Sequence, residues 1–191
     1  MGGSGARLSH LTTSPGLASS PTELGRLLLG IDPGMARTGY GLVRQVRGGE
    51  LELVDFGVIE TQAGQEVSAR LLALEAGIER VLHSHRPESS AVERLFFERN
   101  VSTAMTVGQA RGVALLTLAR HDLPITEYSP VEIKQAVAGY GAADKRQMQT
   151  MVRTLLRMDD LPRPDDAADA LAVAICHAHM SRIRQRMEAG A

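Results

Sequence analysis

One short apolar run, ended by an acid and a turn, constrains the fold of this chain more than any other feature. Residues 27–31 read Leu-Leu-Leu-Gly-Ile and are followed by Asp32 and then by Pro33-Gly34. An apolar run of this length that stops at a Pro-Gly turn is typical of a buried strand. We therefore predict a strand that carries Asp32 at its end.

The rest of the chain predicts a mixed α/β domain. Gly48-Gly49 is a turn signal between two strand-like segments, so the first three strands should form an antiparallel meander. Further on, apolar residues at helical spacing alternate with short strand-like runs, and two helices have capping-box starts. The expected strands cover 26–32, 39–46, 51–59, 89–95 and 125–128, and the expected helices cover 66–83, 102–120, two segments that begin after Ser129 and Asp144, and about 164–179. This order predicts a mixed five-stranded sheet with helices on both faces.

Composition and length favour a single domain. Residues 1–25 are rich in Gly, Ser, Thr and Pro without apolar periodicity, which predicts a disordered tail. We expect one domain over residues 26–182, because 191 residues that are 43% hydrophobic suit one core, and a flexible tail over 183–191. The only cysteine is Cys176, which excludes an intrachain disulfide and suits a reducing compartment. No apolar stretch reaches the ~18 to 20 residues that span a bilayer, so we expect a soluble, cytoplasmic protein without a membrane partner.

The overall charge argues against nucleic-acid binding through bulk positive charge. The formal net charge is -1, whereas such proteins normally carry a basic domain. Any nucleic-acid site would therefore be a local patch. A cluster of acids would itself lower the net charge, and bound dications would offset it locally.

Four acids fall where predicted elements begin or end. A right-handed crossover can place the strand 89–95 parallel to the first strand, so Asp32 and Glu93 should leave the same edge of the sheet. Asp166 and Asp169 share a face of the last helix, and Asp165 is also at helical spacing from Asp169. Oxygen-only clusters suit Mg²⁺ or Mn²⁺, and two such ions can promote phosphodiester hydrolysis. Singly, each acid could be a turn, strand-end or first-turn residue; together they favour a metal site.

Several groups of residues occur here in a combination that is typical of one nuclease family. They are Gly30-Ile31-Asp32-Pro33-Gly34, Thr38-Gly39-Tyr40-Gly41, Glu93 with Phe96 and Asn100, Gly108-Gln109-Ala110-Arg111-Gly112, and Asp166-Ala167-Ala168-Asp169-Ala170-Leu171-Ala172. Jointly they resemble the RuvC-type Holliday-junction resolvases of bacteria, over about residues 26–182. The resemblance implies a ribonuclease-H-like fold and a homodimer in which each subunit nicks one of two opposed strands of a four-way DNA junction.

The same resemblance implies the site residues. The catalytic, metal-binding acids would be Asp32, Glu93, Asp166 and Asp169, where the Asp-Ala-Ala-Asp pattern selects Asp166 over Asp165, although some relatives carry histidine at this third acid. Two Mg²⁺ ions, replaceable by Mn²⁺, would be bound in each site, with Asp32 bridging them and with 5′-phosphate and 3′-hydroxyl products. The family also implies a branch-migration complex as partner.

The expected DNA contacts have ordinary alternatives. Phe96 would stack on an unpaired base, or it is a core residue. Lys134, Lys145 and Arg146 would bind phosphates, or they are solvated helix residues. The helix 102–120, rich in small residues, is our candidate for the dimer surface. The pairs His83/His85 and His177/His179 are two residues apart, which points the rings of a helix in different directions and does not favour metal binding.

Three other functions compete with the resolvase interpretation. An RNA-processing nuclease of the same fold would carry the same acids, because both backbones are phosphodiesters. An actin-like or sugar-kinase ATPase also places an aspartate and a glycine-rich turn after its first strand, but it needs two such domains and would leave Glu93 without a role. A junction-binding scaffold with vestigial acids would bind DNA without cutting it.

Overall fold

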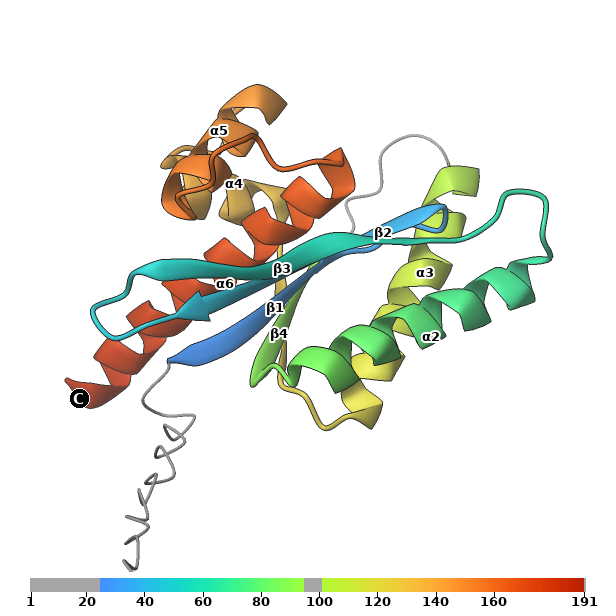
Figure 1. Cartoon of the computed structure of the whole chain (residues 1–191), viewed down its shortest axis with the longest axis horizontal. Helices are drawn as coiled ribbons and strands as arrows, with labels where there is room; N and C mark the ends of the chain where they lie inside the picture. Colours follow the sequence, from blue (N-terminus) through green and yellow to red (C-terminus); the bar gives the residue numbers. More distant parts are fainter. Residues whose placement is uncertain (1–24, 95–100, 191) are drawn as a thin grey trace, which may run out of the picture.

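The computed structural model describes residues 25–94 and 101–190, which form one five-stranded sheet covered by helices on both faces (Figure 1). The strands are β1 (Arg26–Asp32), β2 (Arg37–Gln45), β3 (Leu51–Glu60), β4 (Ser89–Glu93) and β5 (Ile125–Tyr128). The helices are α2 (Val67–His85), α3 (Val101–Arg120), α4 (Pro130–Ala138), α5 (Lys145–Leu155) and α6 (Asp165–Ala189). The sheet order is β3-β2-β1-β4-β5, with β1, β2 and β3 antiparallel and with β4 and β5 parallel to β1. The predicted fold class is confirmed.

The main error of the sequence-based boundaries concerns the last helix. We expected it to end near His179, but α6 continues to Ala189, so residues 183–189 are helical where a tail was expected. The reason is local: no Gly or Pro interrupts the sequence between Asp165 and Ala189, and Gly190 supplies the first stop signal. Within the described ranges, no helix is apolar over a length that could cross a membrane.

The sheet separates two hydrophobic cores. On one face, α2 and α3 pack against side chains such as Leu29, Ile31 and Leu42. On the other face, α6 lies against the sheet and is covered in turn by α4 and α5, around Leu28, Val43 and Leu171 (Figure 1). From Ala167 to Ala178 every residue of α6 except Asp169 is buried. The rest of α6, buried between the sheet and the helices α4 and α5, therefore holds the acidic start of this helix in place.

Glycines let α6 approach the sheet at backbone distance. A side chain at Gly30 would collide with the carbonyl oxygen of Ala170, and one at Gly39 would collide with that of Asp166. A side chain at Gly41 would meet the backbone of Leu171. Only glycine leaves room for a helix backbone at these positions. The spacing of these glycines on β1 and β2 thus fixes the height of α6 above the strands.

A buried polar network joins α6 to β4 and β5. The Nε2 atom of His177 lies 2.9 Å from Ser89 Oγ, and its Nδ1 atom lies 3.1 Å from the Tyr128 hydroxyl. Burial lowers the pKa of His177 from 6.5 to about 4, with the positive charges of Arg26 and Arg184 acting in the same direction. The imidazole is therefore neutral at physiological pH and bridges the two strands.

This network predicts acid sensitivity of the fold. The unfolded chain binds a proton on His177 at higher pH than the folded chain does, so the free energy of unfolding should fall as the pH drops from 6.5 to about 4. We expect this histidine to account for a loss of about 3 kcal/mol. Urea unfolding over this range, with EDTA present, should show a flatter pH dependence for His177→Gln. The exposed His83→Gln variant should keep the wild-type slope, and equal slopes in all three proteins would contradict the assignment.

Candidate metal centre

The first two acids of the predicted centre lie side by side at the carboxyl ends of neighbouring parallel strands. In the pairing of β1 with β4, Ile31 stands opposite Val92, so the next residues along the strands are Asp32 and Glu93. The turn after Asp32 is closed by Thr38, whose hydroxyl donates to the carbonyl oxygen of Gly34 at 2.8 Å and accepts from the Gly34 amide at 3.2 Å. These hydrogen bonds hold the turn that follows Asp32, the last residue of β1.

The other two acids come from the first turns of α6. Gly39 of β2 is paired with Asp32 of β1. Because Gly39 has no side chain, the backbone of Asp166 can lie directly against the sheet at this position. Asp169 lies nearly one turn further along the same face of the helix. The glycine on β2 therefore brings the start of α6 to the end of β1, and acids from three elements face one another.

The carboxylates repel one another in a partly desolvated space. Burial raises the pKa of Asp32 well above its usual value, and the charges of Glu93, Asp169 and Asp166 raise it further. The pKa of Glu93 is raised by burial and by Asp169, against the opposing effects of its hydrogen bond with Asp32 and of Lys134. Burial also raises the pKa of Asp169. A cation placed among these acids would favour their ionised forms.

Two lysines supply part of the compensation. The Nζ atom of Lys145 lies 3.5 Å from an oxygen of Asp169 and 3.1 Å from an oxygen of Asp165. Burial would lower the pKa of Lys145, but its bond to Asp165 and the charge of Asp169 outweigh that effect and raise it. Lys134, Lys145, Glu93 and Asp169 line one cavity of about 220 Å³ beside the acids. Both lysines therefore lie beside the acids.

Removal of the Lys145 charge should shift the pH range of any metal-dependent activity of these acids. Lys145 opposes the effect of burial on Asp169, so Lys145→Gln should raise the pKa of Asp169 further. The acid limb of the pH–rate profile for DNA cleavage should then move to higher pH, with the larger loss of rate at the acidic end. Arg146→Gln removes a neighbouring charge outside this cavity and should leave the acid limb in place. Parallel profiles for both variants would contradict this role of Lys145.

The remaining predicted contacts have different outcomes. Phe96 lies outside the residues that the structure describes, as does Asn100. Arg146 does not line the cavity of Lys145 but a separate pocket with Tyr140 and Gln147, so its role in DNA binding stays a prediction. Asp165 is exposed and is held by Lys145 and by Gln149, whose Nε2 donates to it at 2.9 Å. The geometry thus leaves Asp166, rather than Asp165, on the side of Asp32.

A basic cleft that the sequence did not predict adjoins Asp166. A hollow of about 710 Å³ is lined by the turn after β1, by Thr106 and Val107 of α3, and by Arg37, Arg70 and Asp166. Arg37 also pairs with Glu60 at 3.1 Å, and Arg70 donates to the Thr61 hydroxyl at 2.9 Å. The position of Arg37 just after the Asp32 turn was an available signal, whereas Arg70 comes from α2 and reaches the cleft only through the tertiary fold.

The donor set fits a hard dication. Carboxylate oxygens from β1, β4 and α6 are the ligands that Mg²⁺ and Mn²⁺ prefer, and the pKa values of these acids are raised first by burial and then by the charges of the neighbouring acids. A second possible metal-binding group lies away from these acids. Among the described residues, one donor atom each of Glu79, His83 and His121 lies within 4.8 Å of the other two. The acidic centre and this second group are separate features.

A sheet with this strand order, with acids gathered at the ends of β1 and β4 and at the start of α6, belongs to the ribonuclease-H-like class. The family model described as crossover junction endodeoxyribonuclease RuvC matches residues 28–177. The chain belongs to this RuvC family.

Individual relatives agree with this assignment. A crossover junction endodeoxyribonuclease RuvC of Chloroflexus aurantiacus is 56% identical over 158 residues, which are 83% of this chain and 96% of the relative. The corresponding protein of Moorella thermoacetica is 52% identical over 160 residues, which are 84% of this chain and 95% of the relative. The structure of Thermus thermophilus RuvC in complex with a Holliday junction superimposes with a TM-score of 0.78 at 38% identity, covering 83% of this chain and 96% of that one.

Proposed function

We propose that this protein resolves four-way DNA junctions by paired, symmetric nicks, in homologous recombination and DNA repair. The observation that carries the proposal is the convergence of Asp32, Glu93, Asp166 and Asp169 from three elements at one edge of a ribonuclease-H-like sheet. The similarity to a RuvC structure that holds a Holliday junction supports the choice of DNA substrate over RNA.

The four acids would hold two Mg²⁺ ions, with Mn²⁺ able to replace them. When bound, these ions supply an activated water and neutralise charge on the scissile phosphate. The protein residues set the conditions for this chemistry. Asp32, which is buried and interacts with the other three acids, would hold the ions together with Glu93 and Asp169. Lys145 holds Asp169 and, by opposing the effect of burial, keeps its pKa from rising further.

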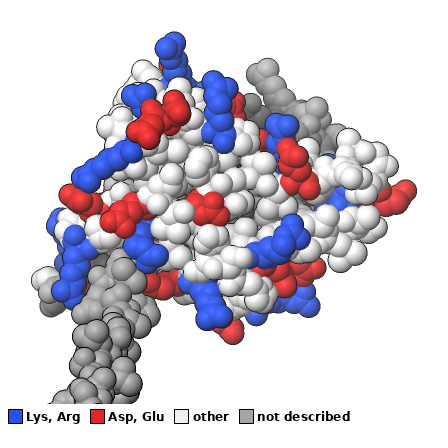
Figure 2. Space-filling model, in the orientation of Figure 1, with Lys and Arg blue, Asp and Glu red and all other residues white. Residues whose placement is uncertain are grey.

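Phosphate contacts would come from local basic groups rather than from a basic face. Figure 2 shows Lys and Arg side chains interspersed with Asp and Glu over the surface in view, in keeping with the net charge of -1. Near the acids, Lys134 and Lys145 lie on one side, and Arg37 and Arg70 lie on the other. DNA would therefore be held along a short line of cations that crosses the acidic centre.

A homodimer follows from the symmetry of the proposed substrate, because two opposed strands present two equivalent cleavage points. Our candidate surface is α3, which exposes the apolar side chains of Met105 and Leu116; the helix packed against it, α2, exposes Leu72. Sedimentation at assay concentrations should give a dimer; a monomer throughout would count against paired cutting. A branch-migration complex is a further proposed partner.

The chemistry of the product ends tests the proposed reaction. Hydrolysis by activated water should leave a 5′-phosphate and a 3′-hydroxyl at each nick, so DNA ligase should seal the nicked duplex products without prior treatment. The reaction should stop when EDTA removes the dication. Products that need a kinase or a phosphatase before sealing would show a different bond cleavage.

A further inference from the structure

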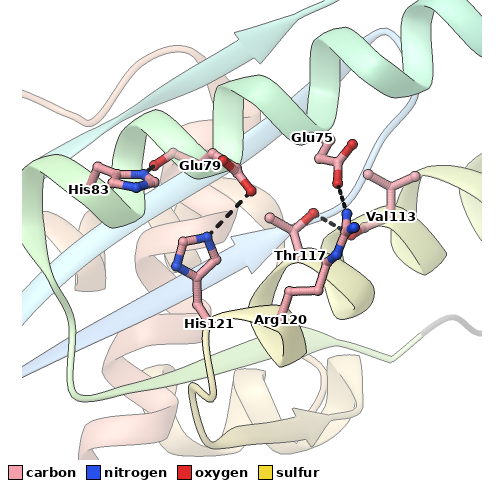
Figure 3. Close-up of polar contacts among 7 residues, drawn as sticks. All are labelled: Glu75, Glu79, His83, Val113, Thr117, Arg120 and His121. Carbon is pink, nitrogen blue, oxygen red and sulfur yellow. Dashed lines mark hydrogen bonds and ion pairs between the residues drawn. The ribbon is translucent and has the colours of Figure 1, made fainter.

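A second group of side chains of a type that can bind a metal ion consists of Glu79, His83 and His121 (Figure 3). Glu79 and His83 belong to the last turns of α2, and His121 directly follows α3. Both helices end just before the starts of β4 and β5, whereas Glu93 stands at the opposite end of β4. The group is therefore at the other end of the sheet from the nuclease acids, on the face covered by α2 and α3.

The donor atoms are already close to a coordination geometry. One donor atom each of Glu79, His83 and His121 lies within 4.8 Å of the other two. The Nε2 atom of His121 is 3.4 Å from Oε1 of Glu79, and the donors around a tetrahedral Zn²⁺ ion are separated by about 3.3 Å. The rings of His83 and His121 stand edge to face at 5.3 Å between centroids. The His83 side chain is exposed and therefore has room to turn toward the other two donors.

Hydrogen bonds orient the ring of His83 and fix the backbone of His121. The Nδ1 atom of His83 lies 2.7 Å from the carbonyl oxygen of Glu79, and it must donate because a carbonyl can only accept. This bond leaves Nε2 as the nitrogen with a free lone pair, which is the arrangement found around metal-binding histidines. The backbone of His121 is fixed by a helix end in which Leu123 donates to Leu118 and Asp122 donates to Ala119.

The nearby charges also suit a cation. Arg120, the neighbour of His121, is paired with Glu75 of α2, with 2.7 Å between Nη1 and Oε1 (Figure 3). Glu79 is thus free to face the two imidazoles instead of the arginine. The side chains of His121 and Glu79 keep 31% and 41% of their surface exposed, so an ion can enter from solvent.

We propose that Glu79, His83 and His121 form a site for a late first-row divalent cation of the Zn²⁺ type, separate from the nuclease centre. Two imidazoles and one carboxylate favour such an ion over Mg²⁺, which prefers oxygen ligands. Water would complete the coordination. The bound ion would join the end of α2 to the end of α3 and stabilise the packing of these two helices.

Zn²⁺ titration tests the site without relying on DNA cleavage. Calorimetry with Zn²⁺ in saturating Mg²⁺, which occupies the oxygen-only centre, should show one site per chain. His83→Gln and His121→Gln should each weaken this binding by about tenfold to a hundredfold or more. The matched control is His85→Gln, because His85 lies on the same helix but pairs with Asp55 instead. It should bind Zn²⁺ like the wild type.

The mode of binding gives a second readout. In nitrogen-detected histidine spectra, Zn²⁺ should shift Nε2 of His83 and leave His85 and His177 unchanged. Zn²⁺ should also raise the melting temperature of the wild type by about 5 to 10 °C at a hundredfold excess over Kd, and should not raise that of His121→Gln. Equal Zn²⁺ affinity in the wild type and both ligand variants, or shifts confined to other histidines, would overturn the proposal. Because none of these readouts uses cleavage, failure of this site is distinguishable from failure of the proposed nuclease.

Discussion

Replacement of Asp32 by Asn should abolish junction cleavage while the protein still binds the junction. Asp32 is buried, and its carboxylate interacts with those of Glu93, Asp169 and Asp166, so its loss removes a ligand that acts together with all three other acids. We expect a fall in cleavage rate of at least about 10³-fold, comparable with the loss of other transition-state contacts. Cleavage of a labelled junction and gel-shift binding, measured on the same protein, separate the two effects.

The same variant should be more stable than the wild type when no metal is present. Burial raises the pKa of Asp32, so this group favours the folded state below its ordinary pKa and disfavours it as the pH rises through the raised value. Asn removes that penalty at neutral pH, and the melting temperature in EDTA should therefore increase. Asp165→Asn is the control, because Asp165 is an exposed acid at the start of α6, outside the proposed ligand set, and its replacement should leave the rate within a few-fold of wild type. Full activity of Asp32→Asn would refute the assignment of this acid.

The second large effect is expected at a residue that carries no functional group. Gly39→Ala places a methyl group against the carbonyl oxygen of Asp166. The atoms that collide belong to the backbone of α6, which cannot move aside as a flexible side chain would. The start of α6 must then move away from β1 and take Asp166 with it. We expect cleavage to fall by about 10²-fold, as for other small misplacements of reactive groups, and the free energy of unfolding to fall by about 1 to 3 kcal/mol.

Gly112 provides the control for this substitution. A side chain at Gly112 on α3 meets no heavy atom within 4 Å, so Gly112→Ala should stabilise the helix by about 0.5 to 1 kcal/mol. Junction cleavage and urea unfolding of both variants test the comparison. Wild-type rate and stability in Gly39→Ala would show that α6 is not positioned by this contact.

Local sequence patterns predicted several of the elements that form or surround the site. The apolar run before Asp32 and the Pro-Gly turn after it specify the end of β1, and the capping boxes at Ser129 and Asp144 specify the starts of α4 and α5. These signals lie within a few residues of one another along the chain. The antiparallel meander and the place of β4 beside β1 then followed from the turn signal and the connection rules, and the approach of Asp32 to Glu93 followed from that placement.

Features that depend on distant contacts could not be predicted in this way. Gly39 belonged to a recognisable motif, but its contact with Asp166 exists only once α6 lies on the sheet. Arg70 reaches the cleft beside Asp166 from another helix. His83 was considered only with His85, whereas its neighbours in the fold are Glu79, one helical turn away, and His121, which directly follows α3. In each case the missing information was which faces of the helices and of the sheet pack together.

The most direct test of the proposed function is cleavage of a labelled four-way DNA junction beside a matched linear duplex and an RNA/DNA hybrid, with Mg²⁺ and with EDTA. We predict paired, symmetric nicks in the junction alone, present with Mg²⁺ and absent with EDTA. Preferential cutting of the hybrid would instead assign the acidic centre to RNA processing. Junction binding without cutting under either Mg²⁺ or Mn²⁺ would contradict the nuclease and leave a scaffold.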